Sequence, residues 1–540
     1  MPASYSKKRE RDRALFEKWD RLPKSCFAGI PLEAMKDAQR KLIGHIVFPG
    51  DPDYDTDRKI FNPVFDPYPA FIFYCEAVGD VAMGLDFAHR YAVGFTVRSS
   101  GHCSAGFCAS SGILIDVSAL NSITVDTQSD PPTVTVGPGT NFGALQSTLQ
   151  GYGLHVPGGE CPDVCVAGYV QGGGYGYTSV TFGMSCDNVQ SFEVVLAGGG
   201  TVIASPEENA DLWWAMQGGT GGNFGVLTSV TYSLVPIDPM FGWALVWPLQ
   251  TSEDIANASE ALMVLQKSYM LNSPYAPNMN IQCSFCYQNW IDPSLPPPPP
   301  DTPLLPYFMV RGLWVGDESS GQTAIKELQQ VPGCFTQWTM VSTFLDLNNK
   351  LLNYPQSMPD IQGSTVPYFD KSSRYVTTEL SSDQWGELLK LFAASPNNCA
   401  YGYLEFYGGN INAAPPNRNA FIHRTSAYNA TMDTLWYTEE QKEACAAFIS
   451  QWNAALEPVW NGEIYQNYCS LNSVPDYPTN YWGAALATLW DIKTKYDPEN
   501  FFTFAQAICP PSGSTPAIDL PTNVAEALKQ PIKYLIPPPR

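Results

Sequence analysis

The sequence is poor in positive charge and in histidine. Its 540 residues include 30 Lys and Arg against 52 Asp and Glu, a formal net charge of −22, and only five histidines. Nucleic acids and anionic membrane surfaces are bound through basic patches, so neither is an expected partner of so acidic a chain. We expect small molecules as partners, and the sequence indicates no oligomeric state.

The sequence also lacks a long apolar run. No stretch reaches the roughly 18 apolar residues that a transmembrane helix needs, so we expect no membrane span. Residues 1–22 are dense in charged side chains and show no secretory signal, which predicts a cytoplasmic protein. The 14 cysteines are scattered. Cys283 and Cys286 form a C-x-x-C pair with no companion pair, so no zinc or other metal site is expected.

Charged residues make up only 15% of the chain and hydrophobic residues 44%, which is typical of a well-packed globular protein. A chain of this length favours two domains. Residues 1–60 predict a helical N-terminal arm, with helices over 13–19 and 31–46. The five-proline run 296–300 predicts an exposed loop, because proline donates no backbone hydrogen bond to a sheet.

Short β-rich segments alternate with helix-compatible ones from about residue 69 to 230, which indicates an α+β or α/β domain. The expected strands are 71–74, 96–98, 113–116, 133–136, 191–196, 201–204 and 226–232. The expected helices there are 78–89 and 142–152. The region from 236 to 478 begins with a strand at 243–247. Further helices are expected at 253–270, 321–330, 382–393, 439–456 and 481–496.

Two segments combine small residues with one nucleophilic side chain each. They are Arg98-Ser99-Ser100-Gly101-His102 and Gly158-Gly159-Glu160-Cys161-Pro162, and the second is followed by the glycine run 172–176. Glycine lets a ligand approach the backbone, and successive exposed N–H groups form anion-binding nests. A flat, phosphate-bearing cofactor held at two points would explain the pair. The residues alone also allow an ordinary loop histidine and an inert buried thiol.

With further motifs downstream, these segments resemble the berberine bridge enzyme-like branch of the vanillyl-alcohol oxidase flavoproteins. The additional motifs, in the family's order, are Asn209-Ala210-Asp211-Leu212-Trp213-Trp214-Ala215, Gly222-Asn223-Phe224-Gly225-Val226, Tyr465-Gln466-Asn467-Tyr468 and Tyr496-Asp497-Pro498-Glu499-Asn500-Phe501-Phe502. The resemblance covers most of 60–235 and 400–510. It implies an α+β fold with a two-part FAD-binding domain of the PCMH type, residues 61–235 and 479–540. A substrate domain, residues 236–478, would contain an antiparallel sheet covered by helices.

The resemblance implies FAD attached to the chain at two points. In the family, the motif histidine bonds to the flavin 8α carbon and the motif cysteine to C6, and His102 and Cys161 hold these positions. Cys103 and Cys165 are nearby rivals, but Pro162 follows Cys161 as in the family, and the role of the two rivals stays open. The full set of expected cofactor-binding residues is His102, Cys161, Arg98, Ser99, Ser100, Gly101, Val164, Gly168, Gly173, Gly174, Gly176 and Val226.

Val164 matches the family position that controls access of oxygen to the flavin. A small β-branched residue there resembles the oxidases, whereas a bulkier leucine would suggest a dehydrogenase. The resemblance therefore implies O2 as acceptor and H2O2 as product. From the residue alone, Val164 could equally be an ordinary packed valine.

Tyr468 is the second tyrosine of the Y-x-N-Y motif, which acts as the base in several family members. A phenol has a pKa of about 10 and must be activated to work at neutral pH. Glu405 matches an acidic or tyrosine partner in sugar-oxidising relatives. We expect Tyr468 to take a hydroxyl proton while hydride passes to flavin N5, and Glu405 to orient Tyr468 or to bind substrate. The alternative for Glu405 is a carboxylate on an edge strand at the surface.

The chain departs from the family at two positions. An ungapped match puts Ala430 where alkaloid and cannabinoid cyclases carry glutamate, which speaks against ring closure, and Ala485 stands where relatives have asparagine. His423 and Arg424 are expected to be structural. The sequence thus predicts an FAD-dependent oxidase of an alcohol or hemiacetal carbon in a sugar, oligosaccharide or related hydroxylated metabolite. The alternative is a tailoring oxidase acting on a polyketide, glycoside or phenolic, including oxidative cyclisation.

Overall fold

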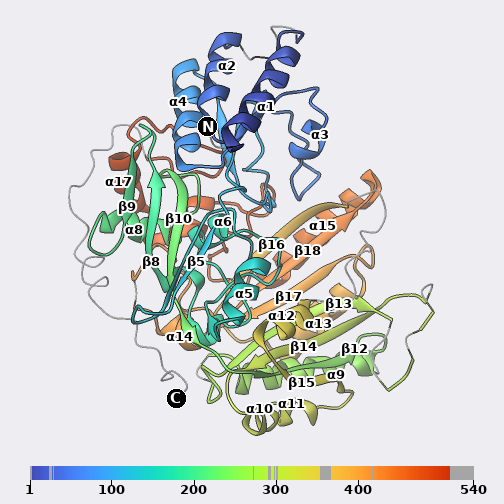
Figure 1. Ribbon diagram of the computed structural model, residues 1–540. Helices are drawn as coiled ribbons and strands as arrows, with labels where there is room; N and C mark the ends of the chain where they lie inside the picture. Colours follow the sequence, from blue (N-terminus) through green and yellow to red (C-terminus); the bar gives the residue numbers. More distant parts are fainter. Residues whose placement is uncertain are drawn as a thin grey trace.

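The chain builds three main β-sheets, with helices at one end and along the outside (Figure 1). The computed structural model describes residues 3–22, 27, 29–271, 273–289, 294–296, 298–299, 302–352, 367–415 and 417–510. The prediction of an α+β fold is confirmed, because two of the sheets are antiparallel and helices cover the largest one. The domain limits stay predictions, and the five-proline run lies partly outside the described residues.

The first sheet follows the N-terminal helices α1 (Ala3–Trp19) and α2 (Leu32–Lys41). Its strand order is β1 (His45–Val47), β2 (Phe71–Tyr74), β4 (Ile113–Asp116) and β3 (Phe95–Arg98). The helix expected over 31–46 is wrong at its end, because β1 takes His45 onward. A side chain at Gly44 would meet the carbonyl of Tyr74 at 1.8 Å, so glycine lets the chain lie directly against β2.

The second sheet is antiparallel throughout. Its strand order is β5 (Ile123–Asp126), β6 (Thr133–Val136), β10 (Val226–Ser233), β8 (Val189–Val195) and β9 (Thr201–Ala204). The shorter elements of this region are α3 (Tyr54–Asp57), α4 (Val78–Tyr91), α5 (Phe142–Gln150), β7 (Leu154–His155), α6 (Val166–Gln171), α7 (Ser179–Phe182), η2 (Ser185–Asn188), α8 (Ala210–Met216) and β11 (Val235–Pro236). The predicted strands are confirmed here, with ends shifted by up to two residues.

The third sheet has seven antiparallel strands. Their order is β15 (Phe335–Ser342), β12 (Met240–Pro248), β14 (Leu305–Trp314), β13 (Met279–Gln288), β17 (Tyr401–Phe406), β18 (Tyr428–Trp436) and β16 (Tyr368–Val376). Side chains alternate between the two faces of a strand. One face is apolar and includes the row Cys283, Leu404 and Ala430, which belongs to a continuous buried core.

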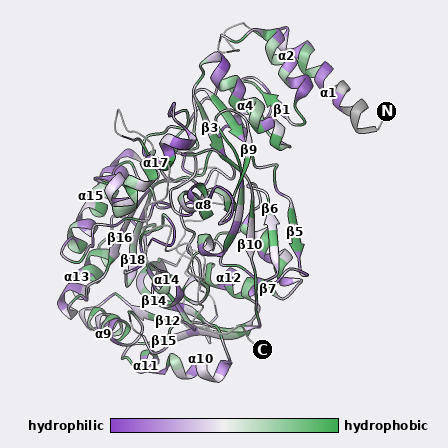
Figure 2. Ribbon diagram, turned by 90° about the vertical axis from the view of Figure 1, so that its left-hand side faces the viewer, coloured by the Kyte–Doolittle hydropathy of each residue, from purple (hydrophilic) through white to green (hydrophobic). Residues whose placement is uncertain are grey.

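Helices α9 (Ser252–Ser268), α13 (Ser382–Ala393) and α15 (Glu439–Leu456) contribute to this apolar core. They mix hydrophobic and hydrophilic residues along their length (Figure 2), as expected for helices with one side buried. Thr251, Ser381 and Thr438 cap their first turns by accepting a backbone N–H. Each such cap is worth about 1 kcal/mol, which explains why these helices begin where the sequence predicts.

The remaining helices are shorter. They are α10 (Glu318–Ala324), α11 (Lys326–Gln329), α12 (Phe344–Leu352), α14 (Gly409–Ala413), α16 (Tyr477–Trp482), η3 (Gly483–Ala485) and α17 (Leu486–Tyr496). The prediction of a single helix over 481–496 is wrong, since α16, η3 and α17 share this range. The break lies at Gly483, which adopts a φ of 42° and turns the chain. Among the described residues, no helix is long and apolar enough to cross a bilayer.

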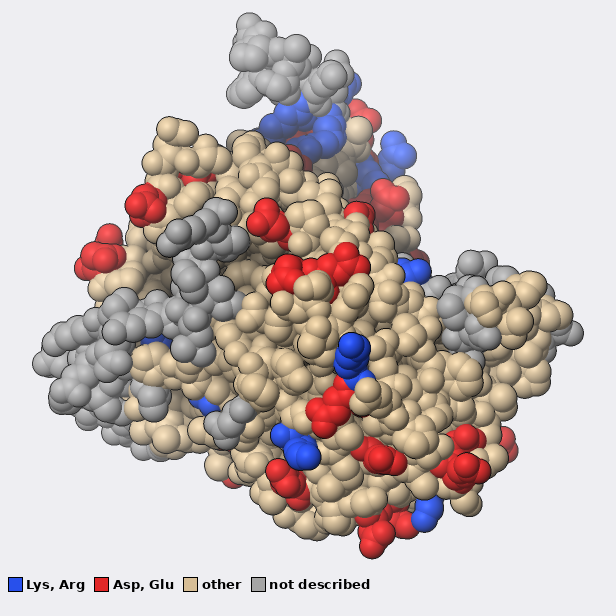
Figure 3. All heavy atoms as spheres, turned by 90° about the horizontal axis from the view of Figure 1, so that it is seen from below, with Lys and Arg blue, Asp and Glu red and all other residues tan. Residues whose placement is uncertain are grey.

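The face seen from below carries Asp and Glu side chains scattered among uncharged residues, with Lys and Arg side chains between them (Figure 3). Inside the molecule, Cys283 and Cys286 lie on β13 in two different buried clusters. A separation of three residues directs side chains to opposite faces of a strand. These two thiols therefore cannot bind one metal ion together.

Candidate active site

A cavity of about 530 Å³ is lined by segments from all three sheets and from the C-terminal part of the chain. It brings together most of the residues that the sequence singled out. Those that line it are Arg98, Ser99, Ser100, Gly101, His102, Cys161, Val164, Gly168, Val226 and Tyr468. Residues that are far apart in the sequence thus line one cavity.

His102 and Cys161 both face this cavity. The imidazole of His102 stacks on Phe61, with ring centroids 4.9 Å apart. Burial lowers the pKa of His102, so its ring is neutral and one ring nitrogen has a free lone pair at pH 7. Cys161 is accessible because it borders the cavity, while burial and then the neighbouring Glu160 raise its pKa to about 11.

Arg98 and Ser100 shape the loop that leads to His102. The guanidinium of Arg98 pairs with the buried carboxylate of Asp116 at 2.7 Å, and the hydroxyl of Ser100 accepts the N–H of Cys165 at 3.1 Å. Gly101 has a φ of 78°, a conformation that favours glycine. Arg98 therefore anchors the loop through an ion pair, and its charge is already balanced.

Gly173, Gly174 and Gly176 are not among the residues that line the cavity, and their role in binding the cofactor stays a prediction. A side chain at Gly173 would meet the ring of Phe421, and one at Gly176 would meet the Gly158 carbonyl at 2.0 Å. The run supports the Y-x-N-Y segment, because the Gly174 N–H donates to the Tyr465 hydroxyl at 2.9 Å. These glycines permit close packing between segments of the protein.

Tyr468 reaches the cavity from the Y-x-N-Y segment and donates a short hydrogen bond from its hydroxyl to Glu405. Glu405 is fully buried on β17, an interior strand, so the alternative of a surface carboxylate is excluded. Its second oxygen accepts the amide N–H of Asn429 at 3.0 Å. Burial, and then the charge of Glu160, raise the pKa of Glu405 to about 8.

Lys371 is a functional candidate that the sequence reasoning missed. It lies on β16, with its ammonium 4.0 Å from the centre of the Tyr468 ring. It donates to the Tyr403 hydroxyl and forms an ion pair with Asp433 at 3.0 Å. A cation over an aromatic face is attracted to the ring. Only the register of β16 on β18, which puts Lys371 opposite Asp433, reveals the cluster.

The polar face of the seven-stranded sheet forms another wall of the cavity. Arg311, Gln282 and Glu405 stand in one row across β14, β13 and β17. The amide of Gln282 donates to the Glu160 carboxylate at 2.8 Å, and Arg311 donates to the Tyr401 hydroxyl at 2.7 Å. In this region the sequence predicted only the strand 243–247 by its range, so the row of polar side chains across β14, β13 and β17 was not foreseen.

Ala430 faces the opposite, helix-covered side of this sheet, where it belongs to the apolar core. Its neighbours Asn429 and Thr431 point to the polar face by strand alternation. The ungapped match to Ala430 therefore does not identify the residue on the side of the cavity. Ala485 is buried in η3 within the core beneath the cavity.

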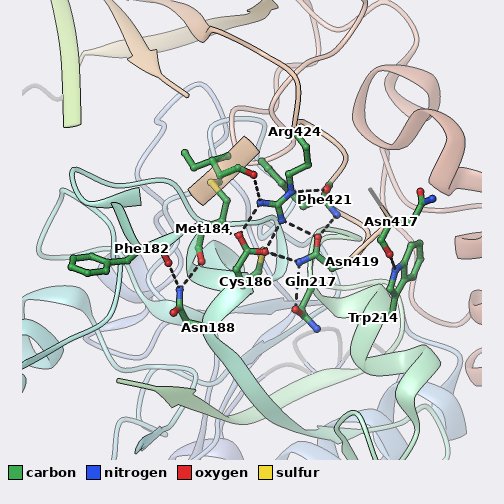
Figure 4. Close-up of polar contacts among 12 residues, drawn as sticks. Phe182, Met184, Cys186, Asn188, Trp214, Gln217, Asn417, Asn419, Phe421 and Arg424 are labelled. Atoms are coloured by element: carbon green, nitrogen blue, oxygen red, sulfur yellow. Dashed lines mark hydrogen bonds and ion pairs between the residues drawn. The ribbon is translucent and has the colours of Figure 1, made fainter. Parts of the chain in front are cut away.

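A buried ion pair joins η2, which precedes β8, to the loop before β18 (Figure 4). The guanidinium of Arg424 contacts both carboxylate oxygens of Asp187, at 2.8 and 2.6 Å, and Asn419 donates to the same carboxylate at 2.9 Å. His423 contacts Glu463 at 2.8 Å on one ring nitrogen and Gln466 on the other. Neither His423 nor Arg424 lines the cavity, so their contacts are structural.

The comparisons with known proteins agree with this geometry. The sequence model for the FAD binding domain matches residues 69–205, and the one for berberine and berberine-like proteins matches residues 464–509. The chain is an FAD-linked oxidoreductase that is similar to the berberine bridge enzyme-like proteins. It is 26% identical over 479 residues to the uncharacterised FAD-linked oxidoreductase YgaK of Bacillus subtilis, covering 87% of this chain and 98% of that one.

Two further members of this group carry more specific names. The chain is 25% identical over 507 residues to a carbohydrate oxidase of Microdochium nivale, covering 86% and 92% of the two chains. It superposes on a glucooligosaccharide oxidase from Acremonium strictum with a TM-score of 0.74 at 20% identity, covering 88% and 99%. At that identity the structural likeness shows the fold alone.

The cavity fits the FAD that this family binds. His102 and Cys161, which both line the cavity, offer a neutral imidazole and a thiol. Gly101 and Gly222, with φ angles of 78° and 76°, bring backbone close to the space without side chains. Small residues and nucleophiles together suit a large, flat, phosphate-bearing group.

Proposed function

We propose that the protein is an FAD-dependent oxidase that removes a hydride from an alcohol or hemiacetal carbon and passes the electrons to O2. His102 and Cys161 would hold the cofactor covalently. The observation that carries the proposal is the setting of Tyr468, which lines the cavity that both anchors also face. Its hydroxyl donates to the Glu405 carboxylate, buried behind the lining residues, and the Lys371 ammonium lies over its ring.

Bound FAD would supply the hydride acceptor and, after reoxidation by O2, release H2O2. The double attachment is supported by the glucooligosaccharide oxidase from Acremonium strictum, whose FAD is 6-S-cysteinyl and 8α-N1-histidyl. His102 is suited to this because burial keeps its imidazole neutral. Cys161 must first lose its proton, since the thiolate is the nucleophile.

Tyr468 would act as the base. It takes the hydroxyl proton of the substrate as its own proton moves along the short hydrogen bond to Glu405. Burial, and then the charge of Glu405, raise the pKa of Tyr468 well above its ordinary value. A free tyrosinate is therefore scarce, and the relay to Glu405 avoids forming one. The Lys371 cation over the ring favours any negative charge that develops there.

Val164 would control access of oxygen. It lines the cavity three residues after Cys161, and its N–H donates to the Cys161 carbonyl at 3.3 Å. This turn fixes the valine side chain beside the point where the cofactor would be attached. A β-branched side chain leaves more space there than leucine would, which supports oxidase behaviour.

The substrate is proposed to be a sugar, oligosaccharide or related hydroxylated metabolite. Gln282, Arg311, Tyr401 and Asp433 line the cavity and provide hydrogen-bond donors and acceptors for hydroxyl groups. The similarity to a carbohydrate oxidase points in the same direction. The polar wall favours this class over the phenolic or polyketide alternative.

The test is a screen of sugars, oligosaccharides, simple alcohols and phenols, with peroxide measured by a peroxidase-coupled assay. Peroxide from the hydroxylated sugars, lost in Tyr468→Phe, supports the proposal. Tyr287→Phe is the matched control, because this buried tyrosine on β13 packs in the apolar core of the helix-covered face. Turnover restricted to phenols, or a Tyr468→Phe enzyme at the wild-type rate, would overturn it.

A further inference from the structure

Four thiols that the proposed mechanism does not use line the same cavity: Cys103, Cys108, Cys165 and Cys469. Cys103 directly follows the cofactor anchor His102, and Cys469 directly follows the base Tyr468. Although 366 positions separate Cys103 from Cys469, their sulfur atoms lie 3.8 Å apart. Both are free thiols in the structure.

The backbone around this pair is already held in place. The Ser104 hydroxyl donates to the Cys469 carbonyl at 2.6 Å, and the Phe107 N–H donates to the Cys103 sulfur at 3.2 Å. A disulfide has a sulfur–sulfur distance of about 2.05 Å, so the two atoms need to approach by about 1.8 Å. Side-chain rotation can supply much of that movement while Ser104 keeps the two loops together.

We propose that Cys103 and Cys469 form a peroxide-responsive thiol pair, which closes to a disulfide and links the cofactor-anchor loop covalently to the loop of the base. For its oxidant the proposal rests on the proposed function, because H2O2 would be released into the cavity that both thiols line. The disulfide would thus join the residue that follows the cofactor anchor His102 to the residue that follows the base Tyr468.

The chemistry balances with H2O2 as the only co-reactant. One thiolate attacks a peroxide oxygen, so a sulfur–oxygen bond forms, the oxygen–oxygen bond breaks and water leaves, giving a sulfenic acid. The second thiol attacks that sulfur, so the disulfide forms and a second water leaves. Two thiols lose two protons and two electrons, and H2O2 is reduced to two molecules of water.

Cys108 offers a competing partner. The hydrogen bond between Cys103 and Cys108 raises the pKa of Cys103 to about 12 and lowers the pKa of Cys108. The hydrogen bond with Cys103 likewise raises the pKa of Cys469. Thiolates at Cys103 and Cys469 are therefore scarce at neutral pH, so the pair should react slowly and only where peroxide is concentrated.

The experiment uses the flavin-loaded protein in three arms: reagent H2O2 without substrate, substrate turnover in air, and turnover with catalase. Free thiols are then alkylated and non-reduced peptides are mapped by mass spectrometry. We expect a Cys103–Cys469 linked peptide and the loss of two thiols per chain in the first two arms. A disulfide that closes so long a loop restricts the unfolded chain, so the melting temperature should also rise by a few degrees.

Cys469→Ser should abolish the linked peptide and the thermal shift, whereas Cys334→Ser, which removes a thiol that does not line the cavity, should keep both. Absence of the linked peptide after reagent peroxide, or a Cys103–Cys108 product in its place, would overturn the assignment. If turnover releases H2O2 but forms no link, the self-generated source is wrong. If turnover releases no H2O2, the oxidase proposal fails. The arm with reagent H2O2 still shows whether Cys103 and Cys469 form the disulfide.

Discussion

The rate of flavin reduction should depend on the ionisation of Glu405. Burial raises the pKa of this carboxyl to about 8, and only the ionised form can accept the proton of Tyr468. About a tenth of a group with that pKa is ionised at pH 7 and about nine tenths at pH 9. The rate constant for reduction should therefore rise about tenfold between these two pH values.

The assay is anaerobic stopped-flow reduction at saturating substrate, followed by the loss of flavin absorbance. Glu405→Gln removes the titrating group, so reduction should be slower than in the wild type and nearly constant from pH 7 to 9. Glu387→Gln, on the exposed side of α13, is the matched control and should keep the tenfold rise. Lys371→Met should move the midpoint upward, because the Lys371 charge lowers the pKa of Glu405.

A tenfold rise that persists in Glu405→Gln would refute the relay from Tyr468. The titrating group would then be sought at Glu160, whose pKa is also raised by burial. A midpoint that falls in Lys371→Met would show that this lysine does not act on Glu405 through its charge.

Three further outcomes are expected. Tyr468→Phe should slow flavin reduction by about 10²–10⁴, the usual cost of losing a general base, and leave reoxidation by air unchanged in stopped-flow measurements. Val164→Leu should slow reoxidation, measured by mixing the reduced enzyme with O2, while reduction stays near the wild-type rate. His102→Ala and Cys161→Ala should each retain the yellow colour after acid precipitation, and the double variant should release flavin into the supernatant. Flavin in the wild-type supernatant would exclude covalent attachment.

The sequence alone was sufficient to identify site residues that belong to a motif of neighbouring residues. His102, Cys161 and Tyr468 were found in this way, and all three line the cavity. Lys371 has no such local signature, because it meets Tyr468 through the pairing of β16 with β18 and the placement of a distant loop. Long-range register, which no single segment contains, decides this part of the site.

The glycine run shows a different limit. Glycine in a sequence indicates close approach but does not name what approaches. At Gly172, a side chain would meet the Asn467 amide at 1.9 Å, and at Gly173 it would meet Phe421. Both neighbours are protein side chains, so these two glycines permit close packing within the protein. A glycine-rich motif therefore needs the fold before its partner can be assigned.

The buried carboxylate also links the chemistry to stability. The pKa of Glu405 is higher in the folded chain, at about 8, than its ordinary value of 4.5, so the folded state binds the proton more tightly. Between these values the wild type must lose stability as pH rises, on the order of a few kcal/mol in total. Glu405→Gln has no proton to lose. The difference between its melting temperature and that of the wild type should therefore increase in favour of the variant from pH 5 to 8 and stay constant above pH 8. Glu387→Gln should show no such trend. If the difference between Glu405→Gln and the wild type were constant from pH 5 to 8, Glu405 would not be the group whose raised pKa makes the stability depend on pH. A buried carboxylate kept at this cost is expected where the proton itself is needed for the reaction.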